Sequence, residues 1–235
     1  MTIEQTIKAC QAIIAEKSYS RHPFVANLKK NALNKNALKN WAIQKYYQVY
    51  LQNQIFSAIH AQTSHEEVRQ FMMEQLIAEE TNINCGSDTH YNLMRRFAEA
   101  CGATEADFNL ELASEPVKNY ADKLVSICRT EHFTLGLLAI YAIENQSGES
   151  VAKLLEWLRD TEEFTEEELE WFAVHSEAED EHASKGLTFI FKYGNSVKNF
   201  DSRGLKIVND ICDTWLALHD YYFSLVSDNQ LAVAR

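Results

Sequence analysis

The chain has 235 residues, of which 46% are hydrophobic, and its formal net charge at pH 7 is −12. This length and apolar content allow a sizeable buried core and exclude an intrinsically disordered chain. Because an acidic protein repels nucleic-acid phosphates, we do not expect DNA or RNA as a partner.

Other features of the composition narrow the fold and the location. Only 7 glycines and 2 prolines occur, and strand-rich folds need many turns that use these residues. The five cysteines include no Cys-x-x-Cys pair, which is typical of reduced thiols in the cytoplasm. No apolar run reaches about 18 residues, and the N-terminus lacks the basic-then-apolar order of a signal peptide. We therefore expect an all-helical, cytoplasmic protein that does not enter a membrane.

The first half of the chain predicts helices separated by polar or proline-containing breaks. They are expected over about residues 2–17, 36–62 and 65–81, and again from about His90. The break at Ser20-Arg21-His22-Pro23 ends the first helix, and Pro23 suits the first turn of a short second helix. A polar stretch at 81–88 precedes His90.

The second half begins with a helix at Pro116, and the remaining helices are expected over about 131–146, 165–192 and 201–227. The 131–146 segment is apolar on nearly all sides, which is typical of a central, buried helix, and we expect Gly148 to end it. Thr165 and Glu168 have the spacing of a capping box at a helix start. About eight helices, with no internal repeat and no low-complexity linker, predict one all-α domain over residues 1–235.

The strongest chemical signal is the run His175-Ser-Glu-Ala-Glu179-Asp-Glu-His182. Positions i, i+4 and i+7 share one face of a helix, so His175, Glu179 and His182 point the same way. Glu179 and His182 also form Glu-x-x-His, the spacing found in di-iron helical bundles. Burying a carboxylate beside two imidazoles is costly unless a metal ion compensates it. A solvated acidic helix face is the alternative that the pattern leaves open.

Two further elements carry candidate ligands. Glu144 continues an apolar stripe on the most hydrophobic helix, and a core glutamate paired with Arg or Lys is the alternative reading. Glu80 follows Met73, Leu76 and Ile77 at core spacing, so we prefer Glu80 and leave Glu79 open. His90 lies beyond the polar stretch. Carboxylates and imidazoles without cysteine suit iron or manganese better than a structural zinc ion.

The order of these motifs resembles a known group of proteins. His22-Pro23-Phe24, Tyr46-Tyr47, Glu79-Glu80, Tyr141 to Gln146 and Phe172 to His182 follow one another as in the PqqC-like and CADD-like branch of the haem-oxygenase-like proteins. The resemblance spans roughly residues 20–225 and implies a single haem-oxygenase-like bundle of about seven or eight helices.

Metal-binding members of that group are di-iron oxidases, and the resemblance implies a set of six ligands. They are Glu80, His90, Glu144, His175, Glu179 and His182. The group usually has Asp where this chain has Glu179, and Asp180 is the neighbouring alternative. Two Fe²⁺ ions, with Mn²⁺ as an alternative, would use O₂ to oxidise a small metabolite or a residue of the protein itself.

The substrate stays open at this stage. Reactions known in the group include production of 4-aminobenzoate from the protein's own tyrosine, so Tyr141 and Tyr47 are candidates for oxidation, with core packing as the alternative. Competing readings are a cofactorless PqqC-like oxidase, a TenA-like thiaminase that uses Cys128 or Cys212, and a non-enzymatic CADD-like interaction module. The resemblance also allows a homodimer and an external electron donor.

Overall fold

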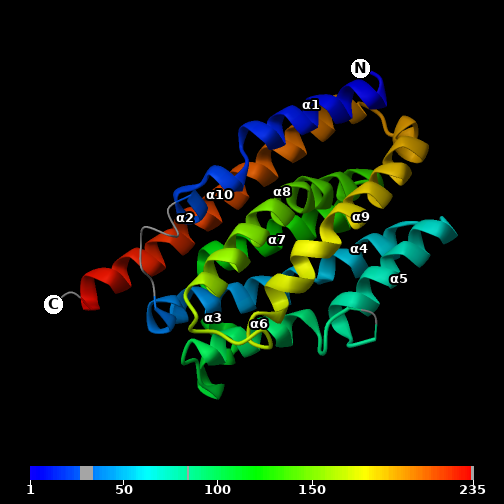
Figure 1. The fold of residues 1–235 in the computed structure, drawn as a ribbon. Coiled ribbons are helices and arrows are strands. Elements are labelled where there is room, and N and C mark those ends of the chain that lie inside the picture. Colours follow the sequence, from blue (N-terminus) through cyan, green and yellow to red (C-terminus); the bar gives the residue numbers. More distant parts are fainter. Residues whose placement is uncertain (27–33, 84, 234–235) are drawn as a thin grey trace.

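A computed structural model describes residues 1–26, 34–83 and 85–233, with side chains described throughout except at 26, 177–183 and 227–233. The described residues contain helices and no strand, which confirms the predicted all-α class (Figure 1). The helices are α1 (Ile3–Glu16), α2 (Pro23–Ala26), α3 (Lys35–Gln52), α4 (Gln54–Gln62), α5 (Glu66–Glu80), α6 (His90–Ala100), α7 (Glu115–Thr130), α8 (Phe133–Asp160), α9 (Glu170–Tyr193) and α10 (Phe200–Val233).

Local sequence explains several helix ends. Thr2 and Gln5 form a capping box at the start of α1, in which each side chain accepts from the other's backbone N–H. Thr89 caps α6 by accepting from the backbone N–H of Asn92. Gly102 follows α6 with φ of +93°, a left-handed conformation that glycine adopts without a steric cost.

Three predicted boundaries were wrong. The helix expected over 36–62 is interrupted at Asn53, a poor helix former, although the backbone dihedrals there remain α-helical. Gly148 does not end α8, because packing of the following turns outweighs the roughly 1 kcal/mol that an interior glycine costs. Thr165 and Glu168 form their reciprocal hydrogen bonds, but on a turn before α9, which begins at Glu170.

Helix α8 occupies the middle of the bundle, as its apolar sequence predicted. It packs against α7, α9 and α10, and α1 lies along α10 (Figure 1). Most of its side chains from Phe133 to Ile143 are buried. The site described below therefore lies between this buried central helix and the helices around it.

An aromatic cluster ties α3, α6 and α9 together. The ring of Phe97 lies 5.8 Å from that of Trp41 and 4.9 Å from that of Phe172, measured between centroids. All three side chains are almost completely buried, and burying an aromatic side chain contributes about 2–3 kcal/mol. This contact fixes the first turn of α9, and the candidate ligand His175 follows in the next turn.

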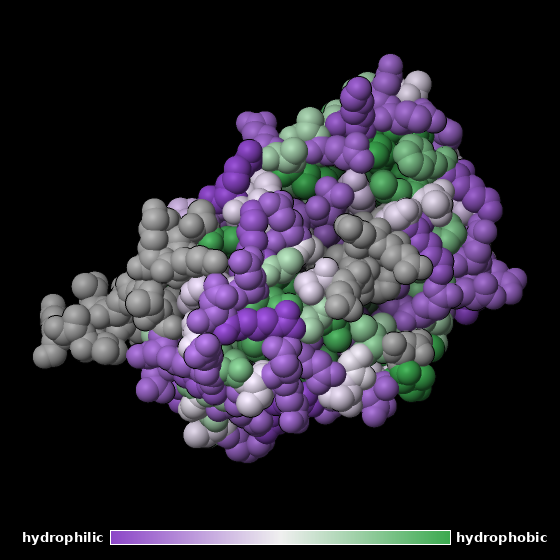
Figure 2. All heavy atoms as spheres, in the orientation of Figure 1, coloured by the Kyte–Doolittle hydropathy of each residue, from purple (hydrophilic) through white to green (hydrophobic). Residues whose placement is uncertain are grey.

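The surface in Figure 2 is mostly hydrophilic, with small separate hydrophobic areas, which accords with the net charge of −12. Within the described part of the chain, no helix combines the length and the apolar character that crossing a bilayer requires.

Candidate metal centre

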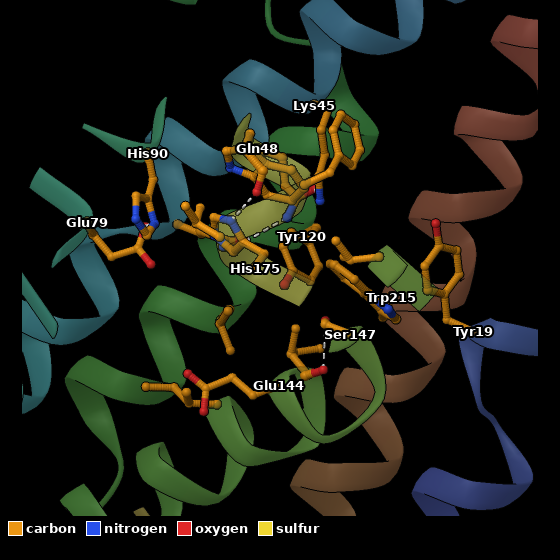
Figure 3. A pocket seen from close by; sticks show the side chains of 18 of the residues that line it. Tyr19, Lys45, Gln48, Glu79, His90, Tyr120, Glu144, Ser147, His175 and Trp215 are labelled. Carbon is orange, nitrogen blue, oxygen red and sulfur yellow. Dashed lines mark hydrogen bonds and ion pairs between the residues drawn. The ribbon is translucent and has the colours of Figure 1, made fainter. Parts of the chain in front are cut away.

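Three potential ligands converge from three helices. Glu79 lies in the last turn of α5, His90 is the first residue of α6, and His175 lies in the second turn of α9. One nitrogen or oxygen atom of each lies within 4.8 Å of the others (Figure 3). The polar stretch between α5 and α6 turns the chain back, so that Glu79 and His90 face the same point. Ligand atoms this close together can share a single metal ion.

The hydrogen bond of His175 defines its tautomer. Nδ1 lies 2.7 Å from the backbone carbonyl oxygen of Trp171, and because a carbonyl only accepts, Nδ1 must carry the hydrogen. Burial, reinforced by neighbouring His90, lowers the pKa of His175 to about 3. The ring is therefore neutral, with its Nε2 lone pair available. Metal-binding histidines commonly donate their other ring N–H to a backbone carbonyl in this way.

His90 has a buried ring whose nitrogens lack well-formed hydrogen bonds. The side chain is 5% exposed, and Nδ1 lies 3.0 Å from Oε2 of Glu79. By strict geometry neither ring nitrogen makes a hydrogen bond with the described residues, although the Glu79 carboxylate and the backbone at Cys85 lie close enough to act on the ring. Burial disfavours the charged ring, but the Glu79 carboxylate outweighs this and raises the pKa of His90. Buried nitrogens without hydrogen bonds are costly, and a metal ion among these three residues would satisfy one of them.

Glu144 borders the same cavity from α8. Burial, with a smaller contribution from the charge of Glu79, raises its pKa to about 8. The side chain is partly accessible because it borders the cavity, yet the surrounding protein rather than bulk water controls its ionisation. It lies apart from the cluster of Glu79, His90 and His175 (Figure 3). A second metal ion nearby would favour the ionised carboxylate.

The structure brings Glu79, and not the preferred Glu80, into the cluster. The inward face assigned to α5 was wrong, because Met73 is 44% exposed whereas Met72 and Gln75 are buried. Residues 72, 75 and 79 share a helix face, so Glu79 continues the buried stripe. Glu80 is exposed.

The other two predicted ligands, Glu179 and His182, lie outside the described side chains, as does the alternative Asp180. The helix α9 runs without interruption from Glu170 to Tyr193, so the i, i+4, i+7 spacing with His175 holds for the backbone. Their assignment as ligands stays a prediction.

The structure does not bring the two predicted tyrosines into this cluster. The hydroxyl of Tyr47 donates to the backbone carbonyl of Asp107, away from the metal cluster. The hydroxyl of Tyr141 accepts from Nε2 of Gln11 at 2.9 Å. Tyr141 shares a small separate cavity with Glu144 but does not line the large one.

The large cavity has a volume of about 100 Å³. The cluster of Glu79, His90 and His175 forms one of its ends, and apolar side chains such as Phe56, Ile140 and Phe172 form much of its wall. Its opposite end holds polar and aromatic residues that the sequence analysis missed. They are Tyr19, Lys45, Gln48, Tyr120, Trp215, His219 and Tyr222. Lys45 lies four residues after the core residue Trp41, and this spacing could have indicated that the lysine faces the interior.

The model of the TENA/THI-4/PQQC family matches residues 10–193. The chain belongs to the TENA/THI-4/PQQC family. Two curated relatives are 4-aminobenzoate synthases. The one from Nitrosomonas europaea is 27% identical over 200 residues, which cover 79% of this chain and 78% of the relative. The one from Chlamydia muridarum is 27% identical over 183 residues, covering 76% of this chain and 75% of the relative.

Solved structures show the same fold for this member of the TENA/THI-4/PQQC family. A TenA homologue from Pseudomonas syringae pv. tomato has a TM-score of 0.75 at 15% identity, covering 94% of this chain and 92% of that one. A CADD-like protein of unknown function from Nostoc punctiforme has a TM-score of 0.72 at 14% identity, covering 96% and 97%. A domain with a heme oxygenase-like fold from Shewanella denitrificans has a TM-score of 0.66 at 13% identity, covering 97% and 91%. The predicted family and haem-oxygenase-like fold are confirmed.

Proposed function

We propose that this protein is a non-haem iron oxidase that uses O₂ and forms 4-aminobenzoate or a closely related aromatic compound. The observation that carries the proposal is the convergence of Glu79, His90 and neutral His175 at one end of an interior cavity. The names of the curated relatives, whose length this chain covers to about three quarters, support the product class.

Six side chains would hold two ions. Glu79, His90 and His175 would bind one, and Glu144 with the predicted Glu179 and His182 would complete the second. Oxygen and imidazole ligands suit iron, with manganese as the alternative. The bound iron would supply the redox chemistry with O₂.

The protein's own residues prepare the site in three ways. The carbonyl of Trp171 holds the Nδ1 hydrogen of His175, so Nε2 points its lone pair toward the ligand cluster. Glu144, with its pKa near 8, carries a proton at neutral pH and must release it when a metal ion binds. The apolar part of the cavity wall, which includes Phe56, Ile140 and Phe172, would limit contact between water and the reacting molecule.

The thiaminase alternative has less support from the structure. Cys128 and Cys212 are both buried and do not line the large cavity. Burial raises the pKa of Cys128 to about 12 and that of Cys212 to about 11, so neither is a ready nucleophile. A cofactorless oxidase would have no need to gather two carboxylates and two histidines at the metal-binding end of one cavity.

Metal analysis followed by oxygen exposure tests the proposal. The protein, purified without air and loaded with Fe²⁺, is expected to bind about two ions per chain, to consume O₂ and to release an aromatic amine detectable by mass spectrometry. The intact mass of the protein before and after turnover distinguishes an added substrate from a residue of the chain. A folded protein that binds neither Fe²⁺ nor Mn²⁺, or that forms the same product without O₂, would overturn the proposal.

A matched pair of substitutions tests the second ion. Glu179→Gln is expected to reduce bound iron from about two ions to about one per chain, because it removes one carboxylate ligand while the Glu79 cluster stays intact. Asp180→Asn, one residue away, is the control and should leave the number near two. Inductively coupled plasma mass spectrometry measures both. Loss in Asp180→Asn alone would move the ligand to Asp180, and no loss in either variant would contradict a second ion held by this run.

A further inference from the structure

Lys45 is a buried lysine in the wall of the large cavity. Its side chain belongs to α3 and the residue is 8% exposed. Nζ donates to Oε1 of Gln48 at 2.9 Å. It also lies 4.9 Å from the ring centre of Trp171 and 5.4 Å from that of Trp215. Two indole faces therefore stabilise a cation at this point.

Three further hydrogen-bond donors gather around Lys45. The hydroxyl of Tyr120 and the indole nitrogens of Trp171 and Trp215 are buried, and none has a hydrogen-bond partner among the described residues. The rings of Tyr120 and Trp215 lie 5.1 Å apart, and all three residues line the cavity. Native proteins rarely leave so many neighbouring buried donors unsatisfied. Among the described residues, three buried donors at this end of the cavity therefore lack an acceptor.

The acceptor nearest to Lys45 is already shared. Oε1 of Gln48 accepts from Nζ of Lys45 and, at 3.1 Å, from the hydroxyl of Tyr222. His219 is held neutral by burial, which lowers its pKa well below the usual range, with a smaller effect from the Lys45 charge. The described residues at this end thus offer the ammonium group of Lys45 and three unsatisfied donors, which are groups that bind an anion.

The acidic residues of the cavity lie at the other end. Among the described lining residues, the carboxylates are those of Glu79 and Glu144 (Figure 3). The indole ring of Trp171 links the two ends, because its centroid lies 4.1 Å from that of His175 and 4.9 Å from Nζ of Lys45. A short, flat molecule is long enough to reach from Lys45 to the metal cluster.

We propose that the end of the cavity around Lys45, Tyr120, Trp171 and Trp215 binds the carboxylate of a small aromatic acid, with the acid's opposite end directed to the Glu79–His90–His175 cluster. The aromatic walls accommodate the ring, and the unsatisfied donors bind the two carboxylate oxygens. Only the role given to the metal cluster rests on the proposed function. The carboxylate site itself is inferred from the residues around Lys45.

Binding to the metal-free protein tests the carboxylate site separately from the oxidase chemistry. The probes are 4-aminobenzoate and its uncharged analogue 4-aminobenzamide, and isothermal titration calorimetry measures their affinity. We expect Lys45→Met to weaken 4-aminobenzoate binding about 10- to 100-fold, because a charge-assisted hydrogen bond is lost. The affinity for 4-aminobenzamide should change less than about threefold. Lys206→Met, whose side chain is 75% exposed, is the matched control.

A second variant keeps the test decisive if Lys45→Met fails to fold. Tyr120→Phe retains the ring and removes only the hydroxyl, and we expect it to weaken 4-aminobenzoate binding about 3- to 10-fold. Equal binding of the acid and the amide by the unmodified protein, or unchanged binding of the acid in both variants, would overturn the carboxylate site. Binding of the acid by a protein that fails the iron test would leave this site standing and remove the oxidase function.

Discussion

Replacing His175 with alanine is expected to lower O₂-dependent turnover at least about 100-fold and to reduce the number of iron ions bound per chain. His175 contributes the Nε2 lone pair that the Trp171 carbonyl makes available, and it lies with Glu79 and His90 in one cluster. Loss of a residue that merely orients a metal ligand costs 10- to 100-fold, so loss of the ligand itself should cost at least the upper value.

The measurement combines iron content, oxygen consumption and far-UV circular dichroism on the same preparation. His60→Ala is the control, because His60 lies on α4 outside the large cavity and its Nε2 accepts from Arg69. It should retain both iron and turnover. A folded His175→Ala protein with full iron content and an unchanged rate would contradict the assignment of His175 as a ligand.

The sequence predicts the all-α class and the helices that carry the ligands, because glycine scarcity and periodicity are local properties. The choice between Glu79 and Glu80 depends on the rotation of α5 about its axis, and adjacent positions differ by about 100°. Leu76 and Ile77 are only half-buried, so they did not define that rotation. The rotation of α5 is set by its packing against α4 and α6. The residues that determine this packing lie on separate helices, so the local sequence of α5 does not predict it.

The missed Lys45 has a different physical cause. A lysine is normally placed at the surface, because burying its charge is costly. In this protein the two indole rings and the Gln48 oxygen offset that cost, and these groups come from α3, α9 and α10. Tyr141 is the opposite case, a residue that the sequence places near the site although its hydroxyl is bonded elsewhere. Spacing places it one turn before Glu144, but its partner Gln11 on α1 determines where the hydroxyl points.

The metal-free protein is expected to lose stability as the pH rises from 6.5 to 8, and Glu144→Gln should remove part of that loss. The pKa of Glu144 is about 8 in the folded protein and near the ordinary glutamate value of 4.5 when the chain is unfolded. The folded state therefore holds a proton that the unfolded state has released, and stability falls with pH between these two values. His175, with its pKa lowered to about 3, has the opposite effect only below about 6.5.

Comparison of the two proteins isolates the contribution of Glu144, since the raised pKa of His90 also makes stability fall as the pH rises above about 6.5. Each pH unit in which only the unfolded state is ionised costs about 1.4 kcal/mol, so the free energy of unfolding of Glu144→Gln should gain about 1–2 kcal/mol over the unmodified protein between pH 6.5 and 8. Urea denaturation at several pH values measures this difference. Glu149→Gln, an exposed position on the same helix, should show no such gain.

Adding Mn²⁺ without air should make the unmodified protein more stable than Glu144→Gln, because the ion stabilises a folded state that keeps the Glu144 carboxylate. The contradicting result would be a metal-free Glu144→Gln protein whose stability equals that of the unmodified protein at every pH. Water would then reach the Glu144 carboxylate freely, and Glu144 would not hold a proton that a binding metal ion displaces.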